Sequence, residues 1–301
     1  MSDPATNVSH AGGDGAVTNS ANRATTATGA GASAGLTVGS DQALLSCAAV
    51  QKYYGAVHAL RGVDFQVRPG EFVALVGDNG AGKSTLVKII AGAIQPSAGT
   101  IRMGGAVTRF PTPTAARGQG IETVYQDLGL CDNLSVVENL FLGRELTRGF
   151  GPFRTIRRKE MLRVSRDVLG RLSMNVPSPR AKVTALSGGQ RQAVALARAR
   201  LWNQRLVLLD EPTAALGVEE TRNCVSTIQE IHAAGAAVVL ISHDIPLVRQ
   251  LSERVVVLRR GQKVGDIGTD QVTEHDIVAM ITGAARLGDV PPDDAAAQPQ
   301  G

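Results

Sequence analysis

The sequence has few cysteines, few aromatic residues and no long apolar segment. Its three cysteines, Cys47, Cys131 and Cys224, are odd in number and lack the spacing of metal ligands, so neither a disulfide framework nor a zinc site is expected. We interpret them as small apolar residues in a reducing compartment. The longest apolar run, 233–241, covers nine residues, whereas a membrane-spanning helix needs about 20. The sequence therefore predicts a soluble, cytoplasmic chain that reaches a membrane only through a partner.

Charge is nearly balanced along the chain. Thirty-one basic residues against 27 acidic ones give a net charge of +4, an excess too small to indicate nucleic acid as a partner. The one basic cluster, Arg154, Arg157, Arg158 and Lys159, lacks interleaved aromatic residues and opens an amphipathic helix. We interpret it as a solvated helix face, and we expect no nucleic-acid partner.

Both ends of the chain are poor in residues that can form a core. Residues 1–40 are mainly Ala, Gly, Ser, Thr and Asn, with Asp3, Asp14 and Arg23 as their only charged side chains. Such a segment cannot offset the entropy cost of ordering, so 1–40 and 287–301 are predicted to be disordered. The first 40 residues have neither the pattern of a secretory signal nor the arginines of a transit peptide. We expect one folded domain at 41–286.

Between the tails, apolar residues recur with the periods of alternating strands and helices. Helices are predicted at 83–91, 159–172 and 190–201. Strands are predicted at 44–50, 63–67, 72–76, 206–209, 237–241, 254–258 and 263–267. Two of these strands, 206–209 and 237–241, are continuously apolar, as in strands that are buried on both faces. The alternation predicts an α/β fold.

A glycine-rich loop joins the predicted strand 72–76 to the helix 83–91. It matches the pattern G-x-x-x-x-G-K-[ST] of phosphate-binding loops in the required strand–loop–helix context. Its glycines let the backbone wrap closely around phosphate oxygens, which amide N–H groups and the helix dipole then stabilise. Lys83 is predicted to contact the β- and γ-phosphates and Ser84 to bind Mg²⁺. The predicted nucleotide-binding residues are Gly77, Asp78, Asn79, Gly80, Ala81, Gly82, Lys83, Ser84 and Thr85.

A buried strand that ends in two acidic residues completes the predicted site. The apolar run 206–209 leads directly into Asp210 and Glu211. Asp210 is predicted to reach the metal, directly or through water, and Glu211 to polarise the attacking water as a general base. An acidic pair after a strand is more often a solvated turn, but the phosphate-binding loop upstream favours the catalytic interpretation.

A second glycine-rich turn, 186–192, lies between these two motifs and reads Leu-Ser-Gly-Gly-Gln-Arg-Gln. Its serine can simply be the N-cap of the helix 190–201. A helix N-terminus with free N–H groups, two glycines and a hydroxyl is also a phosphate site. Because one ATP molecule cannot easily use two helix N-termini of one domain, the turn is predicted to contact ATP held by a second copy of the chain. The residues predicted to make this contact are Ser187, Gly188, Gly189 and Gln190.

With these three motifs in this order, the chain resembles the nucleotide-binding subunits of the ATP-binding cassette (ABC) family over residues 43–285. The resemblance implies a P-loop NTPase core with a mixed sheet, an antiparallel β subdomain and a helical signature subdomain at about 127–190. It implies an ATPase that uses ATP and Mg²⁺ and closes as a dimer around two ATP molecules. Such a subunit drives transmembrane permease subunits as a peripheral protein on the cytoplasmic face of the inner membrane.

Three further residues take their predicted roles from the resemblance alone. Tyr54 matches the aromatic residue that stacks on adenine, although the neighbouring Tyr53 is an alternative and either ring could simply pack in a strand. Gln126 resembles the glutamine that reaches Mg²⁺ and the attacking water, and the segment from there to about residue 142 resembles the surface that meets the membrane partner. His243 resembles the histidine that contacts the γ-phosphate.

One departure from the family pattern concerns the link between the two ATP sites. After Asp210-Glu211-Pro212-Thr213 the family usually continues Ser-Ala-Leu-Asp, whereas this chain has Ala-Ala-Leu-Gly. Gly217 therefore replaces an aspartate that connects the sites, which puts their coupling in doubt but not ATP binding.

The cargo is also predicted by resemblance. The Thr-Ala-Ala-Leu form, with the segments 241–244, 255–258 and 280–283, resembles carbohydrate importers of the ribose, xylose and fructose type. Those importers often fuse two cassettes, whereas this sequence has one, so the resemblance implies a homodimer. An extracytoplasmic sugar-binding protein is implied as an indirect partner.

Three other functions are alternatives to this interpretation of the sequence. The cargo could be another small solute, such as an amino acid or a nucleoside. A soluble cassette ATPase acting on ribosomes or DNA usually carries two cassettes or long coiled-coil insertions, and the sequence has neither. A non-hydrolysing, ATP-gated scaffold does not need Glu211 and His243. We therefore predict the ATP-hydrolysing subunit of a sugar importer.

Overall fold

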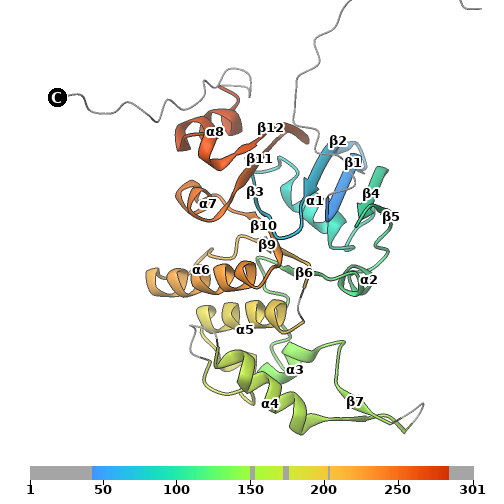
Figure 1. Cartoon of the computed structure of the whole chain (residues 1–301), viewed down its shortest axis with the longest axis vertical. Coiled ribbons are helices and arrows are strands. Elements are labelled where there is room, and N and C mark those ends of the chain that lie inside the picture. The colour runs from blue at the N-terminus through green and yellow to red at the C-terminus, as the bar shows by residue number, and fades with distance from the viewer. Residues whose placement is uncertain (1–42, 150–152, 172–175, 203, 285–301) are drawn as a thin grey trace, which may run out of the picture. The chain divides into compact units, whose positions relative to one another are not determined.

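A computed structural model describes residues 43–149, 153–171, 176–202 and 204–284 (Figure 1). The tails predicted to be disordered, 1–40 and 287–301, lie outside the described residues, and the predicted boundaries of the folded domain stay a prediction. Within the described ranges, none of the helices combines the length and the apolar character that crossing a membrane requires.

A six-stranded mixed sheet forms the centre of the fold. In spatial order its strands are β12 (Gln262–Gly268), β11 (Arg254–Arg259), β3 (Phe72–Gly77), β10 (Ala237–Ile241), β9 (Leu206–Asp210) and β6 (Ile121–Val124). All neighbours are parallel except β12, which pairs antiparallel with β11. Because carboxyl ends of parallel strands meet at one edge, the segments after β3, β6, β9 and β10 lie together there.

Helices cover both faces of this sheet. Along β9, Leu206 and Leu208 belong to the core that contains α1 (Lys83–Ile90), whereas Val207 and Leu209 belong to the core that contains α5 (Gly188–Leu201) and α6 (Val218–Ala233). All five residues of β9 and of β10 are buried, as the continuous apolar runs predict.

A four-stranded antiparallel sheet packs on the other side of α1 (Figure 1). Its order is β2 (Val57–Val67), β1 (Leu45–Tyr54), β4 (Ala98–Met103) and β5 (Ala106–Thr108). The hairpin β1–β2 is longer than the strands predicted at 44–50 and 63–67, because β2 begins six residues earlier. The extension brings Tyr54, at the end of β1, to the rim of the cavity described below.

A helical layer forms a third core on the side of α5 that faces away from the sheet. It contains α3 (Val136–Phe141) and α4 (Arg158–Leu169), and Figure 1 shows both on the side of α5 that faces away from the sheet. Leu140 and Met161 meet Val194 of α5 there. The strands β7 (Thr147–Arg148) and β8 (Thr155–Ile156) form a small hairpin before α4. This layer lies where a helical subdomain is predicted.

Three further helices complete the described fold. They are α2 (Pro113–Gly118), α7 (Ile245–Leu251) and α8 (Glu274–Thr282), and single 3-10 turns occur at Val183–Ala185 and Thr269–Gln271. α7 and α8 pack against β3 and β11 through Val248, Ile277 and Met280. These two helices cover the sheet near the edge at which β11 and β12 lie.

Candidate functional site

The loop after β3 has a backbone that requires glycine at two positions. Gly77 has φ 149° and Gly82 has φ 106°. A Cβ atom at Gly77 would overlap the carbonyl oxygen of Leu258, and one at Gly82 would lie 2.9 Å from Ala59 O. Gly82 is also the N-cap of α1, and it offers no side chain to the helix. The first-turn N–H groups are thus left for an anion, as the loop motif predicts.

Lys83 bends back across this loop. Its side chain is buried, and Nζ donates hydrogen bonds to Gly77 O at 2.7 Å and Asp78 O at 3.0 Å. Burial lowers the pKa of the Lys83 ammonium, and the charges of Glu211 and Asp210 oppose this only in part. An ammonium that is held by two carbonyl oxygens can exchange them for phosphate oxygens, which are stronger acceptors.

Asp210 lies at the end of β9 and beside the start of α1. Its side chain is buried, which raises the pKa of the carboxyl above its ordinary value. A hydrogen bond with Ser84 and the charge of Lys83 act in the opposite direction. A buried carboxylate next to a hydroxyl is an oxygen donor set of the kind that Mg²⁺ prefers, so these two residues fit the predicted metal.

Glu211 has a left-handed backbone, with φ 52°. Its N–H donates to Ile241 O at 3.0 Å, which fixes the residue between the ends of β9 and β10. Non-glycine residues in this conformation cluster at functional sites, because the surrounding structure must stabilise them. The strain therefore supports a functional interpretation of Glu211.

The Glu211 carboxylate faces His243, which follows β10. Nε2 of His243 lies 3.1 Å from Oε1 of Glu211, yet Oε1 has no hydrogen bond with acceptable geometry. Burial raises the pKa of the Glu211 carboxyl, and the charge of His243 opposes this in part. A carboxylate with a raised pKa and an unused acceptor oxygen is suited to take a proton from water.

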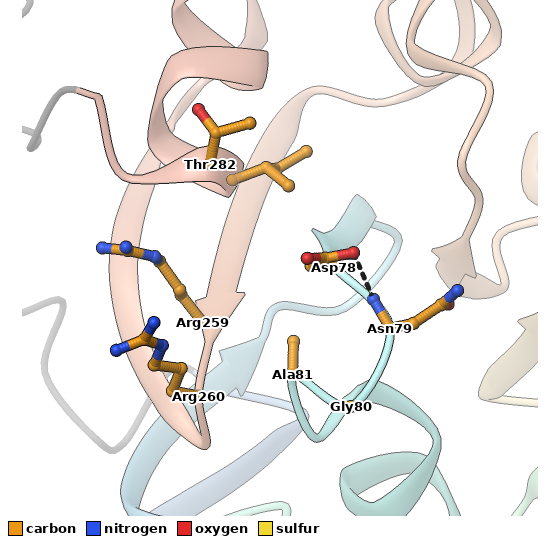
Figure 2. Close-up of a pocket in the computed structure, with 8 residues that line it drawn as sticks. Asp78, Asn79, Gly80, Ala81, Arg259, Arg260 and Thr282 are labelled. Atoms are coloured by element: carbon orange, nitrogen blue, oxygen red, sulfur yellow. Dashed lines mark hydrogen bonds between the residues drawn. The ribbon is translucent and has the colours of Figure 1, made fainter.

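These residues line one cavity of about 550 Å³. The predicted residues on its wall are Tyr54, Asn79, Gly80, Ala81, Gly82, Lys83, Ser84, Thr85, Gln126, Asp210, Glu211 and His243. Two of the predicted loop residues do not line this cavity. The carbonyl oxygen of Gly77 accepts a hydrogen bond from Lys83, and Asp78 lines a smaller neighbouring cavity (Figure 2). Four predicted residues, 187–190, do not line the cavity.

The family described as "ABC transporter" matches residues 60–214 of this chain. The fructose import ATP-binding protein of Rhizobium meliloti is 43% identical over 245 residues, which are 80% of this chain and 94% of the relative. The chain belongs to the ATP-binding cassette transporter family.

Other relatives differ in how much of their length the chain matches. The xylose/arabinose import ATP-binding protein of Sulfolobus acidocaldarius is 41% identical over 82% of this chain and 96% of its own length. A ribose import ATP-binding protein of Escherichia coli O157:H7 is 42% identical, but the match covers 78% of this chain and only 45% of the relative. The chain thus spans nearly the whole of two of these sugar-import relatives and less than half of the third.

Solved cassettes have the same fold. A nucleotide-free ATP-binding cassette from an ABC transporter superposes with a TM-score of 0.68 at 25% identity, covering 80% of this chain and 95% of that chain. A dimeric cassette in a post-hydrolysis state, bound to ADP and Pi, gives 0.65 at 27% identity, covering 75% and 98%. The predicted fold class, a P-loop core with a mixed sheet, an antiparallel β subdomain and a helical subdomain, is confirmed.

The two candidate tyrosines of the cassette have different surroundings. Tyr53 stacks on His58 with ring centroids 4.0 Å apart, so the imidazole already covers one face of the Tyr53 ring. Tyr54 lines the cavity, and the Lys52 ammonium lies 5.3 Å from its ring centroid. This arrangement favours Tyr54 as the ring that is available to adenine.

The glycine-rich turn 186–192, which we call the signature turn, caps α5 in the cassette. Ser187 Oγ accepts a hydrogen bond from Gln190 N at 3.2 Å, and Gln190 Oε1 accepts one from Ser187 N at 3.1 Å. These two bonds form a capping box, which confirms that Ser187 is an N-cap. Ser187 and Gly188 are exposed, on a surface separate from the chain's own cavity.

Gly217, the position that departs from the family pattern, is the N-cap of α6. A Cβ atom there would lie 2.5 Å from Glu220 Oε2, and one at Gly189 would lie 2.5 Å from Glu220 Cγ. The Glu220 side chain therefore occupies the space beside both glycines. This side chain lies between the start of α6 and the signature turn, next to Gly217, which replaces the aspartate of the family pattern.

Sequence reasoning missed several residues of the cavity wall. Val57, His58, Ala59 and Arg61 enter it because β2 begins earlier than predicted. Arg260 enters from the turn between β11 and β12. Gly261 marks this turn in the sequence, but its position next to the phosphate-binding loop depends on long-range packing.

Proposed function

We propose that this cassette is the ATP-hydrolysing subunit of a sugar importer, working as a homodimer on transmembrane permease subunits at the cytoplasmic face of the inner membrane. One observation carries the ATPase part: Lys83, Asp210, Glu211 and His243 meet in a single cavity beneath an uncapped helix N-terminus. The names of the relatives, which import fructose, xylose/arabinose or ribose, support a sugar as the cargo.

The cavity residues divide the chemistry between them. The N–H groups of the loop and the Lys83 ammonium bind the phosphates and stabilise the charge that develops during transfer. Glu211 accepts a proton from the attacking water, and His243, 3.1 Å from it, lies where it can contact the terminal phosphate. Tyr54 stacks on adenine.

Ser84, Asp210 and Gln126 would hold Mg²⁺. All three line the cavity and present oxygen atoms. When bound, Mg²⁺ neutralises charge on the phosphate oxygens. The raised pKa of the Asp210 carboxyl reflects burial without a full counter-charge, which a divalent cation would supply.

The position of the signature turn supports the proposed dimer. Its exposed residues Ser187 and Gly188 lie outside the chain's own cavity, where they could complete the cavity of a second copy. The related cassette bound to ADP and Pi is dimeric, which supports this assembly. An extracytoplasmic sugar-binding protein would deliver the cargo to the permease.

Two measurements test the proposal. The purified chain should hydrolyse ATP in the presence of Mg²⁺, and absence of turnover with and without its permease would overturn the ATPase assignment. Cells that lack the chain should lose uptake of labelled fructose, xylose or ribose. Normal uptake of all three sugars, with loss of an amino acid or a nucleoside, would replace the sugar with another small solute.

A further inference from the structure

Arg260 is a cation on the cavity wall to which the proposed chemistry gives no role. It lines the nucleotide cavity and also a smaller cavity of about 210 Å³ on the other side of Asn79, Gly80 and Ala81. Figure 2 shows its guanidinium and that of Arg259 on the opposite wall of the smaller cavity from the loop. The two cavities share the three loop residues and Arg260, so this side chain lies at the boundary between them.

The backbone of Arg260 is held in an unfavourable conformation. Its φ is 49°, and the next residue, Gly261, has φ 79°. Two successive residues with positive φ form the kind of hairpin turn that favours Asn, Asp or Gly at the first position. An arginine there is therefore unusual, and strained residues of this kind are often retained for function.

Three contacts fix this turn to the phosphate-binding loop and to β2. Gly261 N donates to Ala81 O at 3.0 Å, and Arg61 N donates to Gly261 O at 2.8 Å. A Cβ atom at Gly261 would lie 2.7 Å from Ala59 O, so only glycine allows this close approach. The position of the Arg260 backbone relative to the loop is thus set by the fold, whereas its long side chain is exposed.

The Arg260 guanidinium has no hydrogen-bond or ion-pair partner among the described residues. By contrast, the guanidinium of Arg254, at the start of β11, donates hydrogen bonds to the carboxylates of Glu71 and Asp266. Asp78, which shares the smaller cavity, accepts a hydrogen bond from Asn79 N at 2.7 Å. A cation without a protein partner at the edge of this cavity would attract the negative charge of a bound polyanion.

We propose that Arg260 is a second cationic contact, beside Lys83, for the phosphate groups of the nucleotide. The inference rests on the proposed function, because it requires the cavity to bind ATP. The planar guanidinium can donate two parallel hydrogen bonds to phosphate oxygens, which an ammonium cannot match. Arg260 would therefore raise the affinity for phosphorylated nucleotides and leave the affinity for adenosine unchanged.

Arg259 provides a matched control in the same turn. Its guanidinium packs directly against Gly283 at the end of α8, and it lines only the smaller cavity. Arg259→Gln and Arg260→Gln remove the same charge from adjacent positions. Only Arg260→Gln should weaken nucleotide binding.

The experiment is calorimetric titration of the full chain with ATP and ADP, with adenosine measured by competition. Arg260→Gln should bind ATP about tenfold more weakly, as expected for loss of a charge-assisted hydrogen bond. Arg260→Lys should recover part of the affinity, and Arg259→Gln should match the unchanged chain. The affinity of the unchanged chain should also decrease more steeply with salt than that of Arg260→Gln.

The outcomes separate this inference from the proposed function. If the unchanged chain binds ATP and Arg260→Gln binds it equally well, with the same salt dependence, the role of Arg260 is wrong and the ATPase assignment stands. Equal weakening for adenosine would also overturn it, because the loss would then not concern phosphate. If the unchanged chain binds no ATP, the proposed function itself fails. Should Arg260→Gln fold poorly, Arg260→Lys and the salt series still decide the matter.

Discussion

The nucleotide cavity and the signature turn both present a helix N-terminus with glycines, but their polar groups are satisfied in different ways. At the cavity, α1 starts at Gly82 without a side-chain cap, and buried charges with shifted pKa values surround the opening. At the signature turn, Ser187 and Gln190 cap α5 through a complete capping box. The cavity of a single chain therefore has polar groups that still lack a partner, whereas the capping box of the signature turn forms without any ligand.

This difference indicates what each region needs from a ligand. Binding at the cavity relieves desolvated charges, so it can be strong in a single chain. The capping box uses the N–H groups of Ser187 and Gln190, so the signature turn can offer a phosphate the N–H groups of Gly188 and Gly189, and it needs a second chain to present the ATP. The following predictions test this contrast.

The largest effect is expected for Glu211→Gln. The amide cannot accept the proton of the attacking water, so ATP turnover should fall by about 10²- to 10⁴-fold. ATP binding should be retained, and the dimer should persist in gel filtration with ATP. Glu219→Gln, an exposed carboxylate of α6, is the matched control and should turn over normally. Undiminished steady-state ATPase activity in Glu211→Gln would remove Glu211 from the mechanism.

A smaller effect, on binding, is expected for Lys83→Ala. Loss of the buried ammonium removes charge-assisted hydrogen bonds to the phosphates, so affinity for ATP should decrease by at least about tenfold. Calorimetry measures it, and Lys88→Ala, an exposed lysine on the same helix, should bind ATP normally. An unchanged affinity for Lys83→Ala would contradict the assignment of the loop.

The sequence could predict the parts of the site that are contiguous. The loop 77–85 and the pair Asp210-Glu211 are recognisable because each sequence segment folds locally into a strand end with a defined turn. Tyr54, Gln126 and His243 are single residues at strand ends, and only the resemblance to a family indicated them. Their meeting in one cavity depends on the strand order, which no local pattern contains.

Other parts of the fold were missed for different physical reasons. The helix α6 could have been found, because Cys224, Ile228 and Ile231 recur at helical spacing on its buried face. The strand β6 has only four residues, which is too short for periodicity to identify. Arg260 could not be placed from sequence, since its position depends on the hydrogen bond between Gly261 and Ala81.

A comparison of two serines tests the signature turn directly. Ser187 and Ser135 each form a capping box, at α5 and α3 respectively. Ser187→Ala and Ser135→Ala should each lower the free energy of unfolding by about 1 kcal/mol, measured by urea denaturation. Only Ser187→Ala should also weaken ATP-dependent dimerisation, measured by analytical ultracentrifugation. Equal dimerisation in the two variants would leave Ser187 with a capping role only.

The smallest effect concerns the cost of keeping Glu211 ionised in the nucleotide-free chain. Its pKa is raised by burial above the ordinary value of 4.5, so the folded state binds a proton more readily than the unfolded state does. Above the raised pKa the ionised carboxylate is destabilising. The penalty disappears as the pH falls through the raised pKa toward 4.5. Glu211→Gln should therefore have a slightly higher Tm at neutral pH, and the difference should shrink in mild acid. Glu219→Gln should show no such trend. A lower Tm for Glu211→Gln than for the unchanged chain at neutral pH, with the deficit shrinking in mild acid, would mean that attraction to His243 and Lys83 outweighs burial at this site.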